Sequence, residues 1–201
     1  VAYSDKLSEI ITDMHSLQDV FGRNAHAKVL REDARDIKSI PEKWADMVIT
    51  SPPYANNYDY ADAMRLEMLF WDDINGWKDL QDKVSINLVR ACTQHVSALK
   101  EIATNYLQSE LLFPIRDEIS EKFNLLKSER ENHGGKKNYH LMIAAYFYDM
   151  AKVFHSLNRV TADNCQMCFV IGDSAPYGIY IPVDEWLGKL AIAAGFSNYS
   201  F

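Results

Sequence analysis

The 201-residue sequence lacks the features that mark membrane or secreted proteins. It has no apolar run long enough to cross a bilayer and no recognisable signal peptide. Its three cysteines form an odd count, which argues against a disulfide framework and favours a reducing compartment. We therefore expect a cytoplasmic protein with no membrane partner.

An excess of basic residues is also absent. The 28 acidic side chains outnumber the 21 basic ones, and the net charge is −7. Because lysine and arginine contacts with phosphates supply much of the affinity for DNA, a DNA-binding role needs a local basic surface or a basic segment from elsewhere. The hydrophobic fraction of 48% and the charged fraction of 24% are ordinary for one globular domain with a core.

Cys165 and Cys168 are spaced as C-x-x-C, a pattern that suits a redox pair or half of a zinc site. No second pair and no nearby histidine doublet completes such a site. The neighbouring Met167, Phe169 and Val170 are typical of a strand interior. The sequence therefore predicts a structural strand here and no metal ion.

A short apolar run from Met47 to Ile49 predicts a buried strand that stops abruptly. It is followed by the motif Thr50-Ser51-Pro52-Pro53-Tyr54. Two consecutive prolines cannot continue a sheet ladder, because neither has an N–H and both have a fixed φ. The motif therefore predicts a stiff loop beyond the carboxyl end of a strand, where open α/β sheets bind their ligands.

This motif resembles the catalytic motif of S-adenosylmethionine-dependent DNA amino-methyltransferases, in the form usual for those acting on cytosine N4. The adenine-N6 branch and related protein-glutamine methyltransferases more often carry Asp or Asn in place of Ser51. The stretches Asn56–Tyr60 and Arg65–Glu67 also resemble the residues that come after the motif in some members. A bare Pro-Pro-Tyr occurs in structural loops and WW-domain ligands as well, so the resemblance depends on strand, motif and acidic-aromatic tail together.

The resemblance implies that Ser51, Pro52, Pro53 and Tyr54 form the catalytic loop. The Ser51 hydroxyl and the Pro52 carbonyl would accept hydrogen bonds from an exocyclic amino group and stabilise the positive charge that develops on nitrogen. Tyr54 would stack on a base flipped out of the DNA helix. The methyl group would pass directly from the sulfonium of S-adenosylmethionine to nitrogen, so no cysteine nucleophile is required.

Further site residues are implied by the same resemblance. Cofactor contacts are expected from Asp33 and Ala34, which come after a predicted strand at 27–30, and from Thr50. A carboxylate can accept a hydrogen bond from the adenine amino group, although a helix N-cap role for Asp33 is an equal alternative. Substrate contacts are expected from residues after the motif and after a second predicted buried strand, Gln166–Ile171, namely Asn57, Tyr58, Asp59, Tyr60, Asp173 and Ser174.

The predicted fold class is α/β, with a partial Rossmann-like class I methyltransferase sheet flanked by helices. The three predicted strands are expected to lie adjacent and parallel. The predicted helices are Ser4–Phe21, with Ser4 as N-cap and Gly22 and Asn24 as the stop, and Tyr60–Trp71, Tyr139–Leu157 and Val183–Ala194. We assign residues 1–201 to a single, incomplete catalytic domain with a helical insertion at about 77–138, which suits a target-recognition segment, a helical cap or a subunit interface.

One element of the family is missing. Its members cradle the methionine part of the cofactor with a Phe-x-Gly-x-Gly-like turn, and no such turn occurs here. A partner chain or a segment outside this sequence is expected to supply it. Three hypotheses stay open: a cytosine-N4 DNA methyltransferase, a non-catalytic or split-enzyme subunit that keeps the fold, and methylation of adenine N6 or of a protein amide.

Overall fold

The computed structural model describes residues 2–22, 27–96, 102–135 and 137–201. The chain divides into two compact units, Val1–Arg31 and Glu32–Phe201. The described elements are α1 (Ala2–Phe21), β1 (Ala45–Thr50), α2 (Tyr60–Ala63), α3 (Arg65–Phe70), α4 (Trp77–Asp79), α5 (Ile102–Leu107), α6 (Arg116–Asn132), α7 (Tyr139–Val160), β2 (Thr161–Phe169) and α8 (Val183–Ala193). Short 3₁₀ turns lie at Ser85–Asn87, Thr93–Val96, Glu110–Ile115 and Pro176–Gly178, and a π turn lies at Leu80–Val84. None of these helices is both long and apolar enough to cross a membrane.

The first unit contains the long helix α1, none of whose residues is buried. It stops where the sequence predicts, because Gly22 adopts a φ of +79° and its N–H donates to the Gln18 carbonyl at 2.8 Å. The predicted N-cap at Ser4 is wrong, since the helix begins at Ala2 and Ser4 lies inside its first turn. The second predicted stop residue, Asn24, lies outside the described residues.

The predicted strand at 27–30 is also wrong. These residues are irregular, and the Val29 side chain is 97% exposed. A strand is stabilised by the neighbours with which it pairs, and no described strand pairs with this segment.

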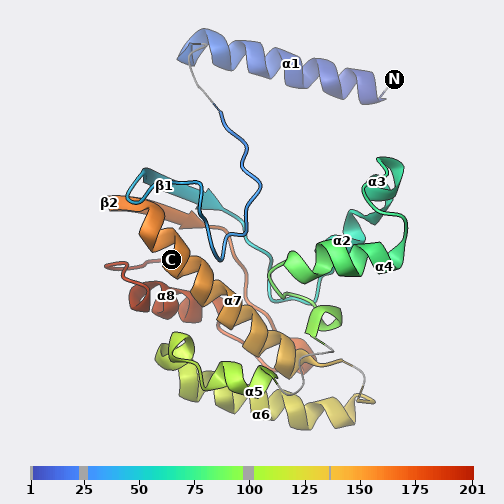
Figure 1. Ribbon diagram of the computed structural model, residues 1–201, viewed down its shortest axis with the longest axis vertical. Helices are drawn as coiled ribbons and strands as arrows, with labels where there is room; N and C mark the ends of the chain where they lie inside the picture. Colours follow the sequence, from blue (N-terminus) through green and yellow to red (C-terminus); the bar gives the residue numbers. More distant parts are fainter. Residues whose placement is uncertain (1, 23–26, 97–101, 136) are drawn as a thin grey trace. The chain divides into compact units, whose positions relative to one another are not determined.

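The second unit contains a parallel sheet whose described strands are β1 and β2 (Figure 1). Val48 lies opposite Met167 and Thr50 opposite Phe169, so the predicted parallel pairing of these two segments is confirmed. The ladder ends with the Val170 N–H donating to the Thr50 carbonyl at 2.9 Å. Both carboxyl ends therefore lie at one edge of a small parallel sheet, and a wider Rossmann-like sheet stays a prediction.

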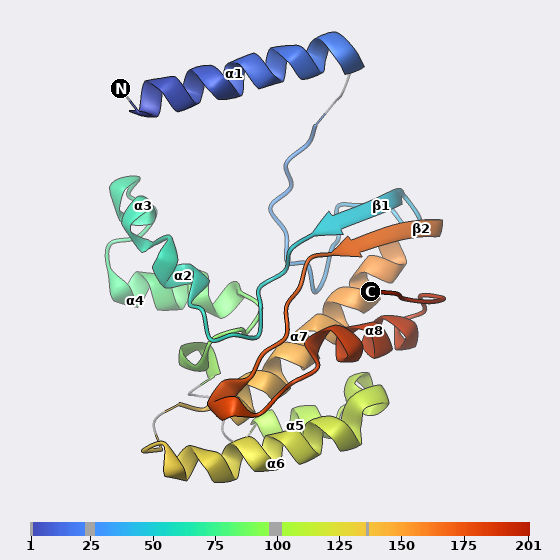
Figure 2. The ribbon, with the colours of Figure 1, turned by 180° about the vertical axis from the view of Figure 1, so that it is seen from behind.

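The strands are only half-buried, which corrects the prediction of fully buried strands. Successive side chains point to opposite faces of a sheet, and Met47 and Ile49 are 58% and 71% exposed. On the other face, Phe169 packs against Phe154 of α7, with ring centroids 5.3 Å apart. Figures 1 and 2 show α7 running diagonally along this face, with α8 beside it and α6 on the far side of α7.

Helix α7 is the centre of the core and confirms the predicted helix over Tyr139–Leu157. Among its buried residues, Phe147 meets Trp186 of α8 edge to face at 5.0 Å. Trp186 in turn donates its indole N–H to Glu118 of α6 at 2.8 Å. Helix α6, which belongs to the predicted helical insertion, therefore shares one core with α7 and α8.

The predicted helix Tyr60–Trp71 is broken into α2 and α3. The break falls at Met64, whose φ of −99° and ψ of 5° leave the helical region. A small separate cluster of Ala61, Ile74 and Leu80 buries only a short stretch of this part of the chain. Most of the apolar face predicted for one continuous helix consequently remains exposed.

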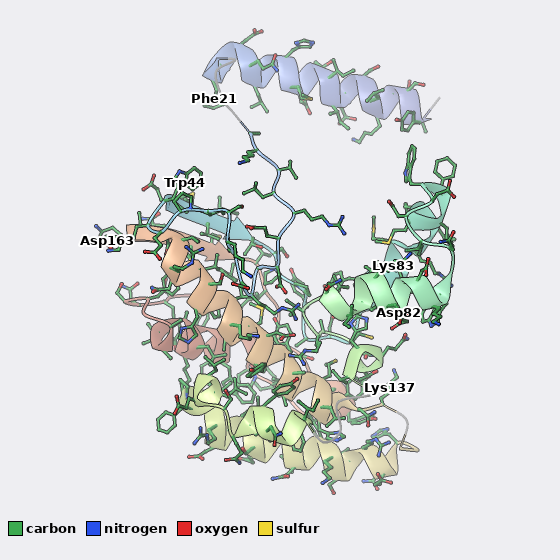
Figure 3. The ribbon with its side chains drawn as sticks, viewed as in Figure 1. Phe21, Trp44, Asp82, Lys83, Lys137 and Asp163 are labelled. Atoms are coloured by element: carbon green, nitrogen blue, oxygen red, sulfur yellow. The ribbon has the colours of Figure 1, made fainter. Side chains whose placement is uncertain are left out.

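The two ends of the sheet differ in chemistry. At the amino-terminal end, where Figure 3 labels Trp44 and Asp163, Lys43 pairs with Asp163 at 2.9 Å. Because this pair is largely exposed, it contributes little to stability. The carboxyl end carries the Pro-Pro-Tyr loop.

Candidate functional site

The loop that comes after β1 holds an exposed hydroxyl beside an aromatic ring. The Ser51 hydroxyl donates to the Val170 carbonyl at 3.3 Å, and its Oγ lies 3.1 Å from the Tyr54 phenol oxygen. A serine hydroxyl has a single proton to donate. Because Ser51 donates it to the Val170 carbonyl, the Tyr54 phenol is the donor in the hydrogen bond between Tyr54 and Ser51. Ser51 Oγ has two lone pairs, and one is left to accept a hydrogen bond from a ligand.

Hydrogen bonds to Ser174 and Tyr60 anchor the same loop. Ala55 is fully buried, and its carbonyl accepts a hydrogen bond of 2.5 Å from the hydroxyl of Ser174, just beyond β2. The backbone N–H of Tyr54 donates to the Tyr60 phenol oxygen at 3.2 Å. Pro52 and Pro53 restrict the backbone between Ser51 and these anchors, so Ser51 and Tyr54 are held on a stiff support.

Tyr146 of α7 is a buried aromatic residue associated with this loop that no signal in the sequence singles out. Burial raises the pKa of its phenol, and the nearby Tyr60 and Tyr54 add to this effect. Its hydroxyl has no hydrogen-bond partner among the described residues. An aromatic residue inside an apolar helix is indistinguishable from core by its sequence pattern, which explains the omission.

Of the residues after the motif, Asn57 has a structural role, and the side chain of Tyr58 is exposed. Asn57 adopts a φ of +64°, accepts from the Thr93 N–H at 2.8 Å and donates its own N–H to the Ala91 carbonyl at 3.1 Å. Tyr58 is 52% exposed and meets the Tyr60 ring edge to face at 4.8 Å. Asn57 therefore ties the loop to the segment 91–93, and Tyr58 remains available to a ligand.

Asp59 has two neighbours of different kinds. One carboxylate oxygen caps α2 by accepting from the N–H groups of Ala61 and Asp62, both at 3.1 Å. The same carboxylate lies 3.3 Å from the His95 imidazole, and the Cys92 thiol is close to both. This cluster was not predicted from the sequence, although the Cys92-x-x-His95 spacing is a signal that could have pointed to it.

Asp173 and Ser174 lie at the edge of the sheet that carries Ser51, as the parallel pairing predicted. Both are occupied by the fold, since Ser174 binds Ala55 and Asp173 accepts from the Val183 N–H at the start of α8 at 3.1 Å. Asp173 also accepts from the Tyr180 phenol at 2.5 Å, and this hydrogen bond raises the pKa of Tyr180 to about 12. Their assignment to substrate stays a prediction.

The Asp33 carboxylate also has hydrogen-bond partners within the chain. Its carboxylate accepts from the Arg35 side chain at 2.8 to 3.0 Å, and these hydrogen bonds lower the pKa of Asp33. It also accepts from the Arg35 backbone N–H at 2.9 Å, which closes a turn that no helix continues, so the alternative of a helix N-cap is wrong. Ala34 is exposed beside it.

Arg35 is held in place by a buried carboxylate. Asp149 of α7, whose side chain is 2% exposed, lies 3.3 Å from Arg35 and 2.5 Å from Arg90. Arg90 also donates to the Tyr106 phenol at 2.6 Å. This network, which the sequence did not reveal, fixes the segments around Asp33 and Arg90 against α7.

Two cavities of the second unit can be compared with the predicted cofactor residues Asp33, Ala34 and Thr50. One cavity, of about 640 Å³, lies among β2, α8 and residues 196–201, and another, of about 290 Å³, lies beside Arg35 and Arg159. None of the three predicted cofactor residues lines either cavity. Their role in cofactor binding stays a prediction.

Comparison with known proteins adds an independent observation. The chain is 30% identical over 174 residues to the Type II methyltransferase M.AvaI of a Nostoc species, a match that covers 82% of this chain and 34% of that protein. The protein of the same name from Anabaena variabilis gives the same values. Type II methyltransferase M.BsoBI of Geobacillus stearothermophilus is 27% identical over 175 residues, covering 80% of this chain and 33% of that protein. The chain spans about a third of the length of these curated relatives, and no family model or solved structure matches it.

Proposed function

We propose that this chain is the base-binding part of a DNA methyltransferase that transfers a methyl group from S-adenosylmethionine to an exocyclic amino group, with cytosine N4 as the acceptor. The observation that carries the proposal is the Ser51–Tyr54 pair at the carboxyl end of β1. It places an exposed hydrogen-bond acceptor and an aromatic ring side by side on a stiff loop. The similarity to Type II methyltransferases over most of the chain supports the reaction class.

The residue types fit the difficulty of the reaction. An exocyclic amine is a poor nucleophile because its lone pair is delocalised into the ring. Acceptors at its two N–H bonds, the Ser51 hydroxyl and the Pro52 carbonyl, draw the nitrogen towards a pyramidal geometry and stabilise its developing positive charge. The Tyr54 ring would stack on the extruded base and offset part of the few kcal/mol that base flipping costs.

The cofactor supplies an electrophilic methyl group when it is bound. Because the sequence has no glycine-rich cofactor turn and the Asp33 carboxylate is hydrogen-bonded to Arg35, we expect this chain alone to bind S-adenosylmethionine weakly. We propose that residues outside this sequence, in a further segment or a partner chain, complete the cofactor site. Calorimetry on the isolated chain tests this expectation, and micromolar or tighter binding contradicts it.

The base assignment depends on Ser51. Carbon-5 methylation needs a cysteine nucleophile, and the Pro-Pro-Tyr loop contains none. Methylation of either exocyclic amine needs similar hydrogen-bond acceptors. The choice of cytosine N4 over adenine N6 therefore depends on Ser51, which lies at the position where the adenine branch usually has Asp or Asn.

The direct test incubates DNA with the chain, together with the segment or partner that completes its cofactor site, and with isotopically methyl-labelled S-adenosylmethionine. The DNA is then digested and the labelled nucleoside is identified by mass spectrometry. N4-methylcytosine is the expected product, and Ser51→Ala should reduce its rate of formation by about 100-fold or more. N6-methyladenine alone overturns the base assignment and leaves the reaction class standing. Label found in protein and absent from DNA points to amide methylation instead.

A second candidate is a non-catalytic subunit that keeps the methyltransferase fold, and the missing glycine-rich cofactor turn favours it. The two candidates differ in the effect of Ser51→Ala. In the assembled, active protein, the substitution lowers the rate of methylation by about 100-fold or more if this chain is catalytic. If the chain only supports another catalytic subunit, the rate stays unchanged.

A further inference from the structure

The cluster of Asp59, Cys92 and His95 is the most unusual group of side chains outside the proposed catalytic loop. One potential ligand atom from each of these residues lies within 4.8 Å of the other two. The group contains one carboxylate, one thiol and one imidazole. It lies where the chain after the Pro-Pro-Tyr loop meets the 3₁₀ turn at Thr93–Val96.

Three buried polar atoms of this cluster, on His95 and Asp59, lack hydrogen-bond partners among the described residues. The His95 side chain is 3% exposed, and neither of its ring nitrogens makes a hydrogen bond there. The second carboxylate oxygen of Asp59, the one that does not cap α2, is also buried and unpartnered. Buried polar atoms without partners destabilise the folded protein, so a ligand that binds several of these atoms at once would stabilise it.

The contact between Asp59 and His95 does not supply the missing hydrogen bonds of this cluster. The two side chains lie 3.3 Å apart, but the alignment is not that of a hydrogen bond. Cys92 is 1% exposed, and burial, together with the nearby Asp59 carboxylate, raises the pKa of its thiol, while the backbone N–H groups of Gln94 and Thr93 and the charge of Lys137 act in the opposite direction. A cation at the centre would replace the thiol proton and compensate the carboxylate.

We propose that Asp59, Cys92 and His95 bind one zinc ion. Thiolate and imidazole ligands favour zinc over magnesium or calcium, which prefer oxygen ligands alone. Zinc bonds of about 2.0–2.3 Å place tetrahedral ligand atoms roughly 3.3–3.6 Å apart. Asp59 and His95 already lie 3.3 Å apart, and any ligand atoms as far apart as 4.8 Å need to approach by about 1 Å. On binding, the Cys92 thiol releases its proton to solvent, and a water molecule takes the fourth position.

The proposed ion has a structural consequence. It would join Asp59, five residues after Tyr54, to the turn that carries Cys92 and His95. The hydrogen bonds of Asn57 with Ala91 and Thr93 already connect the same two segments. Zinc would therefore strengthen an existing clamp beside the Pro-Pro-Tyr loop, and this inference stands whether or not the chain proves to be a methyltransferase.

The test measures metal binding to the full chain and needs no activity assay. The protein is incubated with zinc and then dialysed against metal-free buffer to remove unbound metal. Elemental analysis should then give one zinc per chain. Cobalt substitution should give the thiolate charge-transfer absorption and the visible bands of a tetrahedral site. Zinc should also raise the melting temperature of the protein.

Matched variants identify the ligands. Cys92→Ala and His95→Gln should lose the zinc and the cobalt bands, whereas Cys168→Ala, which removes an exposed thiol of β2, should keep both. Because Cys92→Ala could fail to fold, the double variant Cys165→Ala/Cys168→Ala serves as the second test, and it must retain the cobalt–thiolate band. No binding of zinc or cobalt by the wild-type chain, or binding that depends on Cys165 and Cys168, overturns the proposal.

Discussion

The loops after β1 and β2 carry similar polar residues at one edge of the sheet, but they use them differently. After β1, Ser51 is exposed and its Oγ keeps a free lone pair beside Tyr54. After β2, the buried Ser174 donates a hydrogen bond to the Ala55 carbonyl, and the Asp173 carboxylate accepts hydrogen bonds from Val183 and Tyr180. The first loop presents its polar groups to a ligand, and the second uses them to support the first loop and to start α8.

This difference shows what the position of a residue at a strand end does and does not decide. Parallel pairing brings both loops to the same place, and the partners of each side chain then decide whether it is available. Substitutions in the first loop should therefore change activity without changing stability. Substitutions in the second loop should do the reverse.

The largest effect is expected from Ser51→Ala. In an active preparation of the protein, kcat should fall by about 100-fold or more, by analogy with the removal of one hydrogen-bonding group that stabilises charge in a transition state. Substrate and cofactor affinity should hardly change, because the hydrogen bond matters most as charge develops on nitrogen. The melting temperature should stay near that of the wild type, since Ser51 is exposed. Full activity in this variant would contradict the assigned role.

Tyr54→Ala is expected to have the next largest effect on activity. Loss of base stacking should cost about 1–3 kcal/mol in kcat/KM, or roughly 5- to 150-fold. The matched control is Tyr54→Phe, which keeps the ring and removes only the hydroxyl that lies 3.1 Å from Ser51. Steady-state kinetics on both variants should separate the ring from the hydroxyl. Equal losses in the two variants would mean that the hydroxyl, and not stacking, is important.

Ser174→Ala should show the opposite behaviour to Ser51→Ala. Removing its hydroxyl leaves the buried Ala55 carbonyl without its donor, at a cost of about 1–3 kcal/mol in the free energy of unfolding. For a protein of this size, each kcal/mol lowers the melting temperature by about 2–4 °C. Thermal unfolding of the two serine variants side by side measures the contrast. If Ser51→Ala proves the more destabilising of the two, the comparison between the loops is wrong.

Asp173→Asn should produce the smallest effect, best seen by pH titration. The hydrogen bond to Asp173 raises the pKa of Tyr180 to about 12, above its ordinary value of about 10. A raised folded-state pKa stabilises the fold below the ordinary pKa, and this contribution is lost as the pH rises through about 12. Ultraviolet titration of tyrosinate should show one tyrosine moving towards its ordinary pKa in the variant. An unchanged titration curve would show that this hydrogen bond is absent in solution.

The sequence by itself determined the local features of the fold. The apolar periodicity of residues 139–157 predicted α7, and Gly22 predicted where α1 ends. The apolar runs ahead of Ser51 and Gly172 predicted the parallel pair, and the two prolines predicted the loop at its end. These features arise from the chirality and hydrogen bonding of a few adjacent residues, so a short window of sequence contains the information.

Only the tertiary structure decided which residues find partners. The amphipathic patterns of α1 and α7 look alike in sequence, yet α1 buries no residue and α7 forms the centre of the core. Asp33 meets Arg35, and Arg35 meets Asp149 more than a hundred positions away, while Asp59 meets Cys92 and His95. The physical reason is that burial and electrostatic pairing are properties of distance in space, and the folding of the whole unit sets those distances.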